Sequence, residues 1–223
     1  MTASEQIRVL EPFVTENKKR LVEEVLARRT RFVTVVLEDI YKPHNASAVI
    51  RTCECLGVQD MHIIENVEEY HVNPYVVRGA SQWLTLKHYK EESNNTAGCL
   101  DHLKQQGYQI IATSPAAQAQ SLDTFQIDQP SAFVFGNEHG GVSEEVLSLA
   151  DQHLLIPMYG FTESYNLSVS AAIILNQVRW QLKDSLINWQ LSELEKEQLR
   201  LAWYMEIVHN SEIILRNAKH QSN

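Results

Sequence analysis

The sequence predicts an α/β fold with a mostly parallel sheet covered by helices on both faces. Short runs of β-branched and aliphatic residues recur along the middle of the chain, and segments with helical spacing of apolar residues separate them. These runs are continuously apolar, which is typical of parallel strands that are buried on both faces. Alternating strands and helices therefore indicate one doubly covered sheet.

The individual elements follow in order along the chain. Residues 4–29 have apolar positions at helical spacing, which predicts one or two leading helices. Six runs are then predicted to be strands: FVTVVLE, MHIIEN, LTLKHY, YQIIATS, AFVFGN and HLLIPM. Helices are predicted near residues 45–57, 96–106, 143–150 and 167–184. Ser192 and Glu195 match a capping box, which predicts an amphipathic helix, and SEIILRNAKH predicts a second, shorter one.

Composition indicates an ordinary globular protein. With 223 residues, 44% of them hydrophobic, the chain can bury one core and carry extensions. We expect a helical extension over 1–30, a main domain over 31–184 and a second helical extension over 185–223. No apolar run is long enough to span a membrane, and the first residues lack the order of a secretory signal, so we expect a cytoplasmic protein.

The cysteines and histidines do not predict a metal site. The three cysteines form no CxxC pair, and the nine histidines are scattered. The glycine-containing stretch FVFGNEHGGVSEEV matches neither a phosphate-binding loop nor a hydrolase elbow. A metal enzyme and a nucleotide hydrolase are therefore not indicated.

A local basic cluster departs from the overall charge. The net charge of −9 argues against nucleic-acid binding. Residues 18–31, however, contain six basic and two acidic side chains, a balance of +4. This cluster is either a solvated helix face or an RNA-binding surface. Its candidate RNA-binding residues are Arg28, Arg29 and Arg31, followed by Lys18, Lys19 and Arg20.

Three segments place polar residues where a predicted strand ends and a helix begins. Open α/β sheets bind ligands at such points. In KPHNASAVIRTCECLGV, Asn45 can cap a helix, and Arg51 comes six residues later, nearly two turns on, so the two side chains can lie on related sides. An arginine among apolar neighbours either extends its charged group to solvent or binds an anion.

The second and third segments have the same organisation. In FVFGNEHGGVSEEV, Gly136 and its neighbouring glycines permit close backbone approach, and Ser143 can cap the following helix. Glu138 either fixes this loop or contacts a substrate. In IPMYGFTESYNLSVSAA, polar residues interrupt an apolar run, and Asn166 or Ser168 starts a helix rich in small residues. Taken singly, each segment is also consistent with a simple strand-to-helix turn.

Together, NASAVIRT, GNEHGGVS and IPMYGFTESYNLSVSAA resemble the three motifs of the SPOUT-superfamily RNA 2′-O-ribose methyltransferases, in particular the SpoU/TrmH group. The resemblance covers about residues 20–182, and VLARR followed by YKPHNASAVIRT is similar to bacterial enzymes that act on a guanosine of the tRNA D-loop, at position 18. It implies a trefoil knot in the C-terminal part of the domain, a homodimer, tRNA as the partner and S-adenosylmethionine as the cofactor.

The resemblance also assigns roles to individual residues. It implies a catalytic set made of Asn45, Arg51, Glu138, Ser164 and Asn166, and cofactor contacts from Thr113, Gly136, Ile156, Tyr165, Leu167 and Ser168. Tyr165 replaces a commoner aliphatic residue, and His139 and Gly141 also depart from frequent types. Because a guanidinium stays protonated, we expect Arg51 to stabilise a developing alkoxide and hold a phosphate. The alternatives are methylation of rRNA, and an RNA-binding protein that kept the fold without activity.

Overall fold

The computed structural model describes residues 1–91, 94–115 and 118–221. The chain divides into two compact units, one formed by Arg31–Trp189 and the other by Met1–Thr30 together with Gln190–Asn223. The sequence suggests separate extensions at the two ends of the chain. In the structure both belong to one unit, because helices from the two ends pack against each other.

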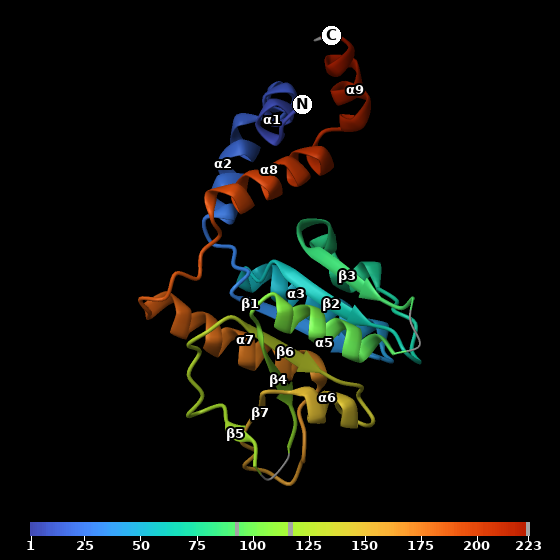
Figure 1. Ribbon diagram of the computed structural model, residues 1–223, viewed down its shortest axis with the longest axis vertical. Coiled ribbons are helices and arrows are strands. Elements are labelled where there is room, and N and C mark those ends of the chain that lie inside the picture. Colours follow the sequence, from blue (N-terminus) through green and yellow to red (C-terminus); the bar gives the residue numbers. More distant parts are fainter. Residues whose placement is uncertain (92–93, 116–117, 222–223) are drawn as a thin grey trace. The chain divides into compact units, whose positions relative to one another are not determined.

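In the larger unit, the described strands form one seven-stranded sheet in the order β3-β2-β1-β6-β4-β7-β5 (Figure 1). Every neighbouring pair in it runs parallel, which confirms the predicted sheet. The sequence predicts every strand except β5, whose two residues are too few to show a period. The strands are β1 (Val33–Glu38), β2 (Asp60–Ile64), β3 (Thr85–Tyr89), β4 (Gln109–Thr113), β5 (Gln120–Ser121), β6 (Ser131–Phe135) and β7 (Gln152–Leu155).

The boundaries of the four predicted helices in this unit lie close to those in the structure. Two short elements, α4 and η2, have no counterpart in the prediction. The helical elements are α3 (Pro43–Leu56), α4 (Pro74–Val77), η2 (Ala80–Trp83), α5 (Asn95–Gln105), α6 (Glu144–Leu149) and α7 (Leu167–Asp184). Ser143 caps α6 as predicted, and Asn166 caps α7.

The start of α3 corrects one expectation. Asn45 does not cap this helix, since the helix begins at Pro43 and its N-cap residue, Lys42, makes no side-chain capping bond. Proline suits the first turn of a helix, where its missing N–H group would have no partner. The Asn45 side chain is therefore available for other contacts.

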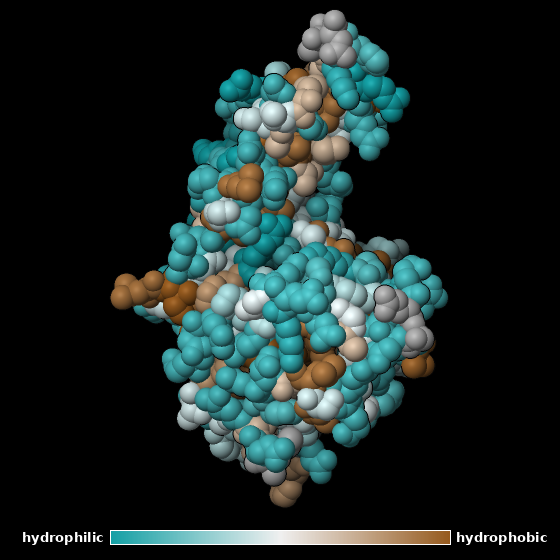
Figure 2. Space-filling model, viewed as in Figure 1, coloured by the Kyte–Doolittle hydropathy of each residue, from teal (hydrophilic) through white to brown (hydrophobic). Residues whose placement is uncertain are grey.

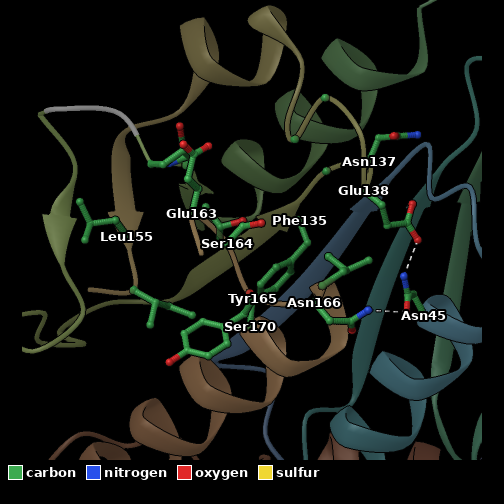
Figure 3. A pocket seen from close by; sticks show the side chains of 18 of the residues that line it. Asn45, Phe135, Asn137, Glu138, Leu155, Glu163, Ser164, Tyr165, Asn166 and Ser170 are labelled. Carbon is green, nitrogen blue, oxygen red and sulfur yellow. Dashed lines mark hydrogen bonds between the residues drawn. The ribbon is translucent and has the colours of Figure 1, made fainter. Parts of the chain in front are cut away.

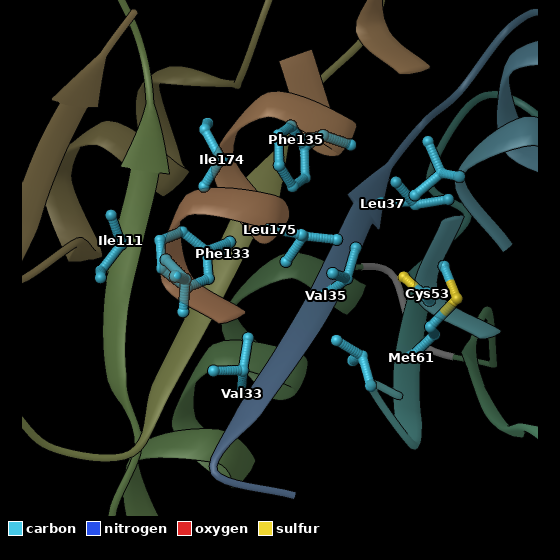
Figure 4. Packing of buried hydrophobic residues seen from close by; sticks show 14 of the residues in the cluster. Val33, Val35, Leu37, Cys53, Met61, Ile111, Phe133, Phe135, Ile174 and Leu175 are labelled. Carbon is cyan, nitrogen blue, oxygen red and sulfur yellow. The ribbon is translucent and has the colours of Figure 1, made fainter. Parts of the chain in front are cut away.

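The core has two parts because successive side chains of a strand point to opposite faces. Val33, Val35 and Leu37 of β1 belong to a cluster with residues of α3 and α7, among them Leu175 (Figure 4). Val36 belongs to a second cluster, with residues of α5 and α6. Helices thus cover both faces of the sheet, as the continuously apolar strands predict.

The strand order determines where the loops meet. β1 pairs with β2 on one side and with β6 on the other, so the chain reverses its order of strand addition beside β1. Crevices at such reversal points, outside the carboxyl ends of the strands, are the usual ligand sites of open α/β sheets. The three polar segments follow β1, β6 and β7, whose carboxyl ends lie at this edge.

The smaller unit is helical. Its elements are α1 (Ala3–Leu10), η1 (Glu11–Phe13), α2 (Glu16–Leu26), α8 (Glu193–Ile207) and α9 (Ser211–Gln221). The predicted capping box of α8 is confirmed, with both reciprocal bonds between Ser192 and Glu195 present. Leu10, Leu26 and Trp203 are buried here.

The molecular surface in Figure 2 is mainly hydrophilic, with small hydrophobic areas between polar side chains. Over the described residues, no helix has both the length and the apolar composition that crossing a membrane requires.

Candidate active site

A cavity of about 780 Å³ opens at the carboxyl ends of the central strands. Its volume lies within the range of roughly 300–1,000 Å³ that is usual for small-molecule sites. The walls come from the loops after β4, β6 and β7 and from the first turns of α3 and α7. The predicted site residues that line it are Asn45, Thr113, Gly136, Glu138, Ile156, Ser164, Tyr165, Asn166 and Leu167.

Two predicted site residues do not line the cavity. Ser168 turns toward Asn166, whose Oδ1 atom accepts hydrogen bonds from its backbone N–H at 2.9 Å and its hydroxyl at 2.7 Å. Arg51 is exposed on α3, whereas Asn45 on the same helix is 3% exposed. Six residues correspond to about 600° of helix rotation, so the two side chains point in different directions. The expectation that they share a side was wrong.

Several lining residues have no counterpart among the predicted site residues. They flank predicted positions in the same loops, so closeness to a strand end is the signal that could have found them. Glu163 belongs to the polar interruption before α7, and Lys42 precedes the first turn of α3. The additional lining residues include Lys42, Asn137, His139, Leu155, Met158 and Glu163.

The Glu138 carboxylate holds the first segment in place. Its two oxygens accept hydrogen bonds from the backbone N–H groups of Tyr41 at 3.1 Å and Lys42 at 3.2 Å. A third bond comes from Nδ2 of Asn45, at 2.6 Å from Oε1. Three donors around one carboxylate satisfy much of its hydrogen-bonding capacity, and bonds to a charged acceptor are the stronger kind. The structure therefore favours loop fixation as the function of Glu138.

Asn45 extends this contact to the third segment. Its Oδ1 atom accepts a hydrogen bond from Nδ2 of Asn166 at 3.1 Å, while its own Nδ2 donates to Glu138 (Figure 3). Asn166 is also the N-cap residue of α7. Leu155 and Glu163 lie on the other side of the cavity from this chain of bonds (Figure 3). One series of side-chain bonds thus joins the loops after β1, β6 and β7.

Groups at the end of β1 and directly after it hold the loop after β6 in place. Glu38 is 3% exposed, and its carboxylate accepts bonds from the Ser143 N–H at 2.8 Å and the Ser143 hydroxyl at 2.7 Å. Asn137 donates from Nδ2 to the carbonyl of Asp39 at 2.7 Å. Both ends of the loop are therefore fixed to the end of β1, which limits its freedom to move.

Gly136 is required by the loop's own backbone. A Cβ atom at this position would lie 2.1 Å from the carbonyl oxygen of Gly141 and 2.2 Å from the nitrogen of Val142. The loop turns back on itself here, with the Gly141 N–H donating to the carbonyl of Asn137 at 2.8 Å. The sequence predicts that Gly136 allows a ligand to approach the backbone. In the structure it also allows the backbone to approach itself.

Replacing Glu138 with glutamine tests the fixation of the first segment. Glutamine keeps the size of the side chain but presents an NH2 group to N–H groups that now donate to a carboxylate. We therefore expect kcat/KM for the RNA methylation that the resemblance implies to fall by about 10- to 100-fold. Thermal unfolding should change little by comparison. Glu69→Gln removes an exposed carboxylate outside the cavity and should leave both measurements unchanged. Equal loss of activity in the two variants would contradict the role given to Glu138.

The predicted RNA-binding residues differ in their surroundings. Arg29 is only 1% exposed, and its guanidinium lies 5.4 Å from the centre of the Trp203 ring, so it is a buried structural residue and not a surface contact. Arg31 pairs with Asp60 at 3.0 Å. Lys19 pairs with Glu16 at 2.8 Å.

The remaining predicted RNA-binding residues are Arg28, Arg20 and Lys18. Arg28 and Arg20 are exposed, and Lys18 is partly exposed.

In the described residues, no group of three or more His, Cys, Asp or Glu side chains is arranged to hold a metal ion.

Comparisons with known proteins agree with this architecture. Residues 32–176 match the SpoU rRNA Methylase family. The tRNA (guanosine(18)-2'-O)-methyltransferase of Borreliella burgdorferi is 44% identical over 209 residues, which cover 94% of each chain. The protein of the same name from Escherichia coli strain K12 is 34% identical over 180 residues, 79% of this chain and 77% of that one. The crystal structure of the A. aeolicus TrmH/SpoU tRNA modifying enzyme has a TM-score of 0.77 at 29% identity and covers 87% of this chain and 98% of that one.

Proposed function

The chain belongs to the SpoU rRNA Methylase family, and from this premise we propose that it methylates the ribose 2′-hydroxyl of guanosine 18 in tRNA, with S-adenosylmethionine as methyl donor. Relatives whose names state this activity support the proposal, one of them aligned over 94% of both chains. The observation that carries it is the cavity in which the three polar segments meet. A tRNA substrate also implies that the protein works in the cytoplasm.

The lining of the cavity fits the proposed methyl donor. Leu155, Ile156 and Leu167 offer apolar walls to an adenosyl group, and Thr113 and Gly136 place strand-end backbone beside them. Glu163 provides a carboxylate that can accompany a positively charged ligand. When bound, S-adenosylmethionine supplies an electrophilic methyl group on a positively charged sulfur.

The contribution of the chain is alignment. Asn45, Glu138 and Asn166 hold the loops in one arrangement, so the cavity is shaped before the substrates arrive. Fixing two reactants in a productive geometry can supply up to roughly 7–11 kcal/mol of a reaction barrier in favourable cases. In such a transfer the bond between the ribose oxygen and the methyl carbon would form while the methyl–sulfur bond of the donor breaks and leaves its electron pair on sulfur, and the hydroxyl proton would leave. A guanidinium stays protonated, so Arg51 stabilises the negative oxygen and a neighbouring phosphate of the RNA takes the proton.

Arg51 is exposed and does not line the cavity of its own chain, and we therefore propose that a second copy supplies it in a homodimer. The exposed face of α7 supports this, since Val169 is 43% exposed and Trp180 is 56% exposed on the same helix. The two residues are eleven apart, three helical turns, and so share one face. Light scattering coupled to gel filtration should give twice the mass of the chain.

Binding of tRNA is proposed to use the exposed cations of the N-terminal segment. Arg28→Ala should weaken tRNA binding and lower the slope of log affinity against log salt by about 1, because one phosphate contact is lost. Arg29→Ala should instead lower the melting temperature, because it removes a buried stack on Trp203. Binding titrations at several salt concentrations separate the two effects. An unchanged slope in Arg28→Ala would remove that residue from the RNA-binding surface.

The proposed reaction is tested by mapping ribose methylation in total RNA. The purified protein is incubated with S-adenosylmethionine and with unmodified tRNA or rRNA, and the modified position is located by mass spectrometry. We expect one 2′-O-methylguanosine in the D-loop of tRNA and none in rRNA. Modification of rRNA alone would establish the alternative substrate. Absence of both methylation and calorimetric donor binding would indicate an RNA-binding protein without activity.

A further inference from the structure

Two exposed aromatic side chains, Tyr41 and His139, lie together beside the cavity. Tyr41 is 55% exposed although its neighbour Ile40 is buried. Its ring lies 5.7 Å from the imidazole of His139, centre to centre, with the planes inclined at 58°. Tyr41 follows β1 and His139 follows β6, so the pair joins the first and second segments. His139 lines the cavity, and Tyr41 precedes the lining residue Lys42.

Backbone hydrogen bonds hold both residues of this pair in place. The Tyr41 N–H donates to Oε2 of Glu138 at 3.1 Å, and the His139 N–H donates to Oδ1 of Asn137 at 2.8 Å. These bonds use backbone atoms and leave both rings available for contacts. A pre-positioned exposed ring loses little conformational freedom when it binds a flat ligand.

The neighbouring residues indicate what kind of ligand suits the pair. Lys42 and His139 line the cavity, and Lys42, the residue after Tyr41, adds an exposed positive charge. Proteins that recognise unpaired RNA bases stack them on Tyr, Phe, Trp or His rings and hold the adjoining phosphates with cations. A single nucleotide carries both a flat base, which suits the two rings, and a phosphate, which suits the lysine that follows Tyr41 in the chain.

We propose that Tyr41 and His139 form a stacking platform for the base of the nucleoside whose ribose is methylated, with Lys42 at its phosphate. This inference rests on the proposed function, because it concerns the RNA substrate of the same cavity. The platform holds the base at the rim so that its ribose enters the cavity. Tyr41 and His139 are thus positioning residues for the substrate and take no part in proton transfer.

Kinetics with tRNA test the platform. Tyr41→Ala and His139→Ala should each raise the KM for tRNA by roughly 5- to 150-fold, the range that loss of one base–aromatic stack produces. Tyr41→Phe keeps the ring and should stay close to the wild type. Tyr75→Ala removes another exposed tyrosine, outside the cavity, and serves as the matched control. Donor affinity measured by calorimetry should be the same in Tyr41→Ala, Tyr41→Phe and Tyr75→Ala as in the wild type, since neither tyrosine lines the cavity.

A spectroscopic measurement reports stacking directly. A tRNA with 2-aminopurine at the target position should lose fluorescence on binding the wild-type protein and Tyr41→Phe, and much less on binding Tyr41→Ala. Equal quenching and equal KM in the wild type and Tyr41→Ala would overturn the platform. If Tyr41→Phe quenched the fluorescence as weakly as Tyr41→Ala, the platform would also be overturned, because the aromatic ring would then not be the part of the side chain that binds the base. If the wild type itself leaves tRNA unmethylated, the proposed function fails, while the quenching comparison still decides the platform.

Discussion

Replacing Arg51 with alanine should lower kcat for tRNA methylation by about 100-fold or more, because the developing oxygen charge loses its electrostatic partner. Arg51→Lys should recover only part of this loss if the planar, two-pronged guanidinium is what binds oxygen and phosphate together. Donor binding should survive in both variants, since Arg51 lies outside the cavity of its own chain. Single-turnover assays at saturating tRNA and donor measure the effect.

Mixing two inactive variants decides whether Arg51 acts across a dimer. Arg51→Ala protomers keep the cavity, and Gly136→Ala protomers keep the arginine. In a twofold dimer, random mixing restores about a quarter of the sites, because half of the dimers are mixed and each has one complete site. If Arg51 served its own chain, no site would be complete and the mixture would stay inactive. The result therefore tests the dimer and the arginine together.

Replacing Gly136 with alanine should abolish donor binding. The new methyl group would lie 2.1 Å from a backbone oxygen, so the loop after β6 has to move, and with it Glu138 and the attached first segment. We expect calorimetry with S-adenosylmethionine to show at least about a 100-fold loss of affinity, since overpacking against backbone is hard to relieve. Activity should fall with it.

Gly140→Ala is the matched control for this loop. A Cβ atom at Gly140 meets nothing within 4 Å, so the substitution should be tolerated. Retained donor binding in Gly140→Ala together with loss in Gly136→Ala attributes the effect to the close approach of the backbone and not to loop composition. Normal donor binding in Gly136→Ala would show that the loop can rearrange without harm.

Local patterns in the sequence predict most of the fold. The continuously apolar runs indicate strands covered on both faces, and both core clusters follow from them. Ser192 with Glu195 marks the start of α8 because capping depends on residues only three apart. The trefoil knot remains a prediction of the resemblance. β5 and α4 are missing from the prediction because two and four residues are too short to show a period.

The chemistry of the site follows less directly from the sequence. The sequence predicts that Asn45 caps a helix. In the structure its side-chain amide instead joins the loops that carry Glu138 and Asn166. Arg29 reads as an RNA contact because it lies in a basic run, yet the fold buries it against Trp203. In both cases the deciding partner is far away in the sequence, so no local pattern reveals it.

By itself, the sequence determined all of the described strands except β5, the principal helices, the capping residues Ser143 and Ser192 and the order of the three polar segments. These features depend on neighbours within a few turns or one strand. Only the tertiary structure decided that Glu138 fixes the first segment, that Gly136 serves the loop's own backbone and that Arg51 lies outside the cavity. These outcomes depend on the pairing of β1 with β6 and on the side of α3 that packs against α7. Such pairings bring together residues about a hundred positions apart in the sequence. The side of α3 that is buried then decides which of its side chains face the site.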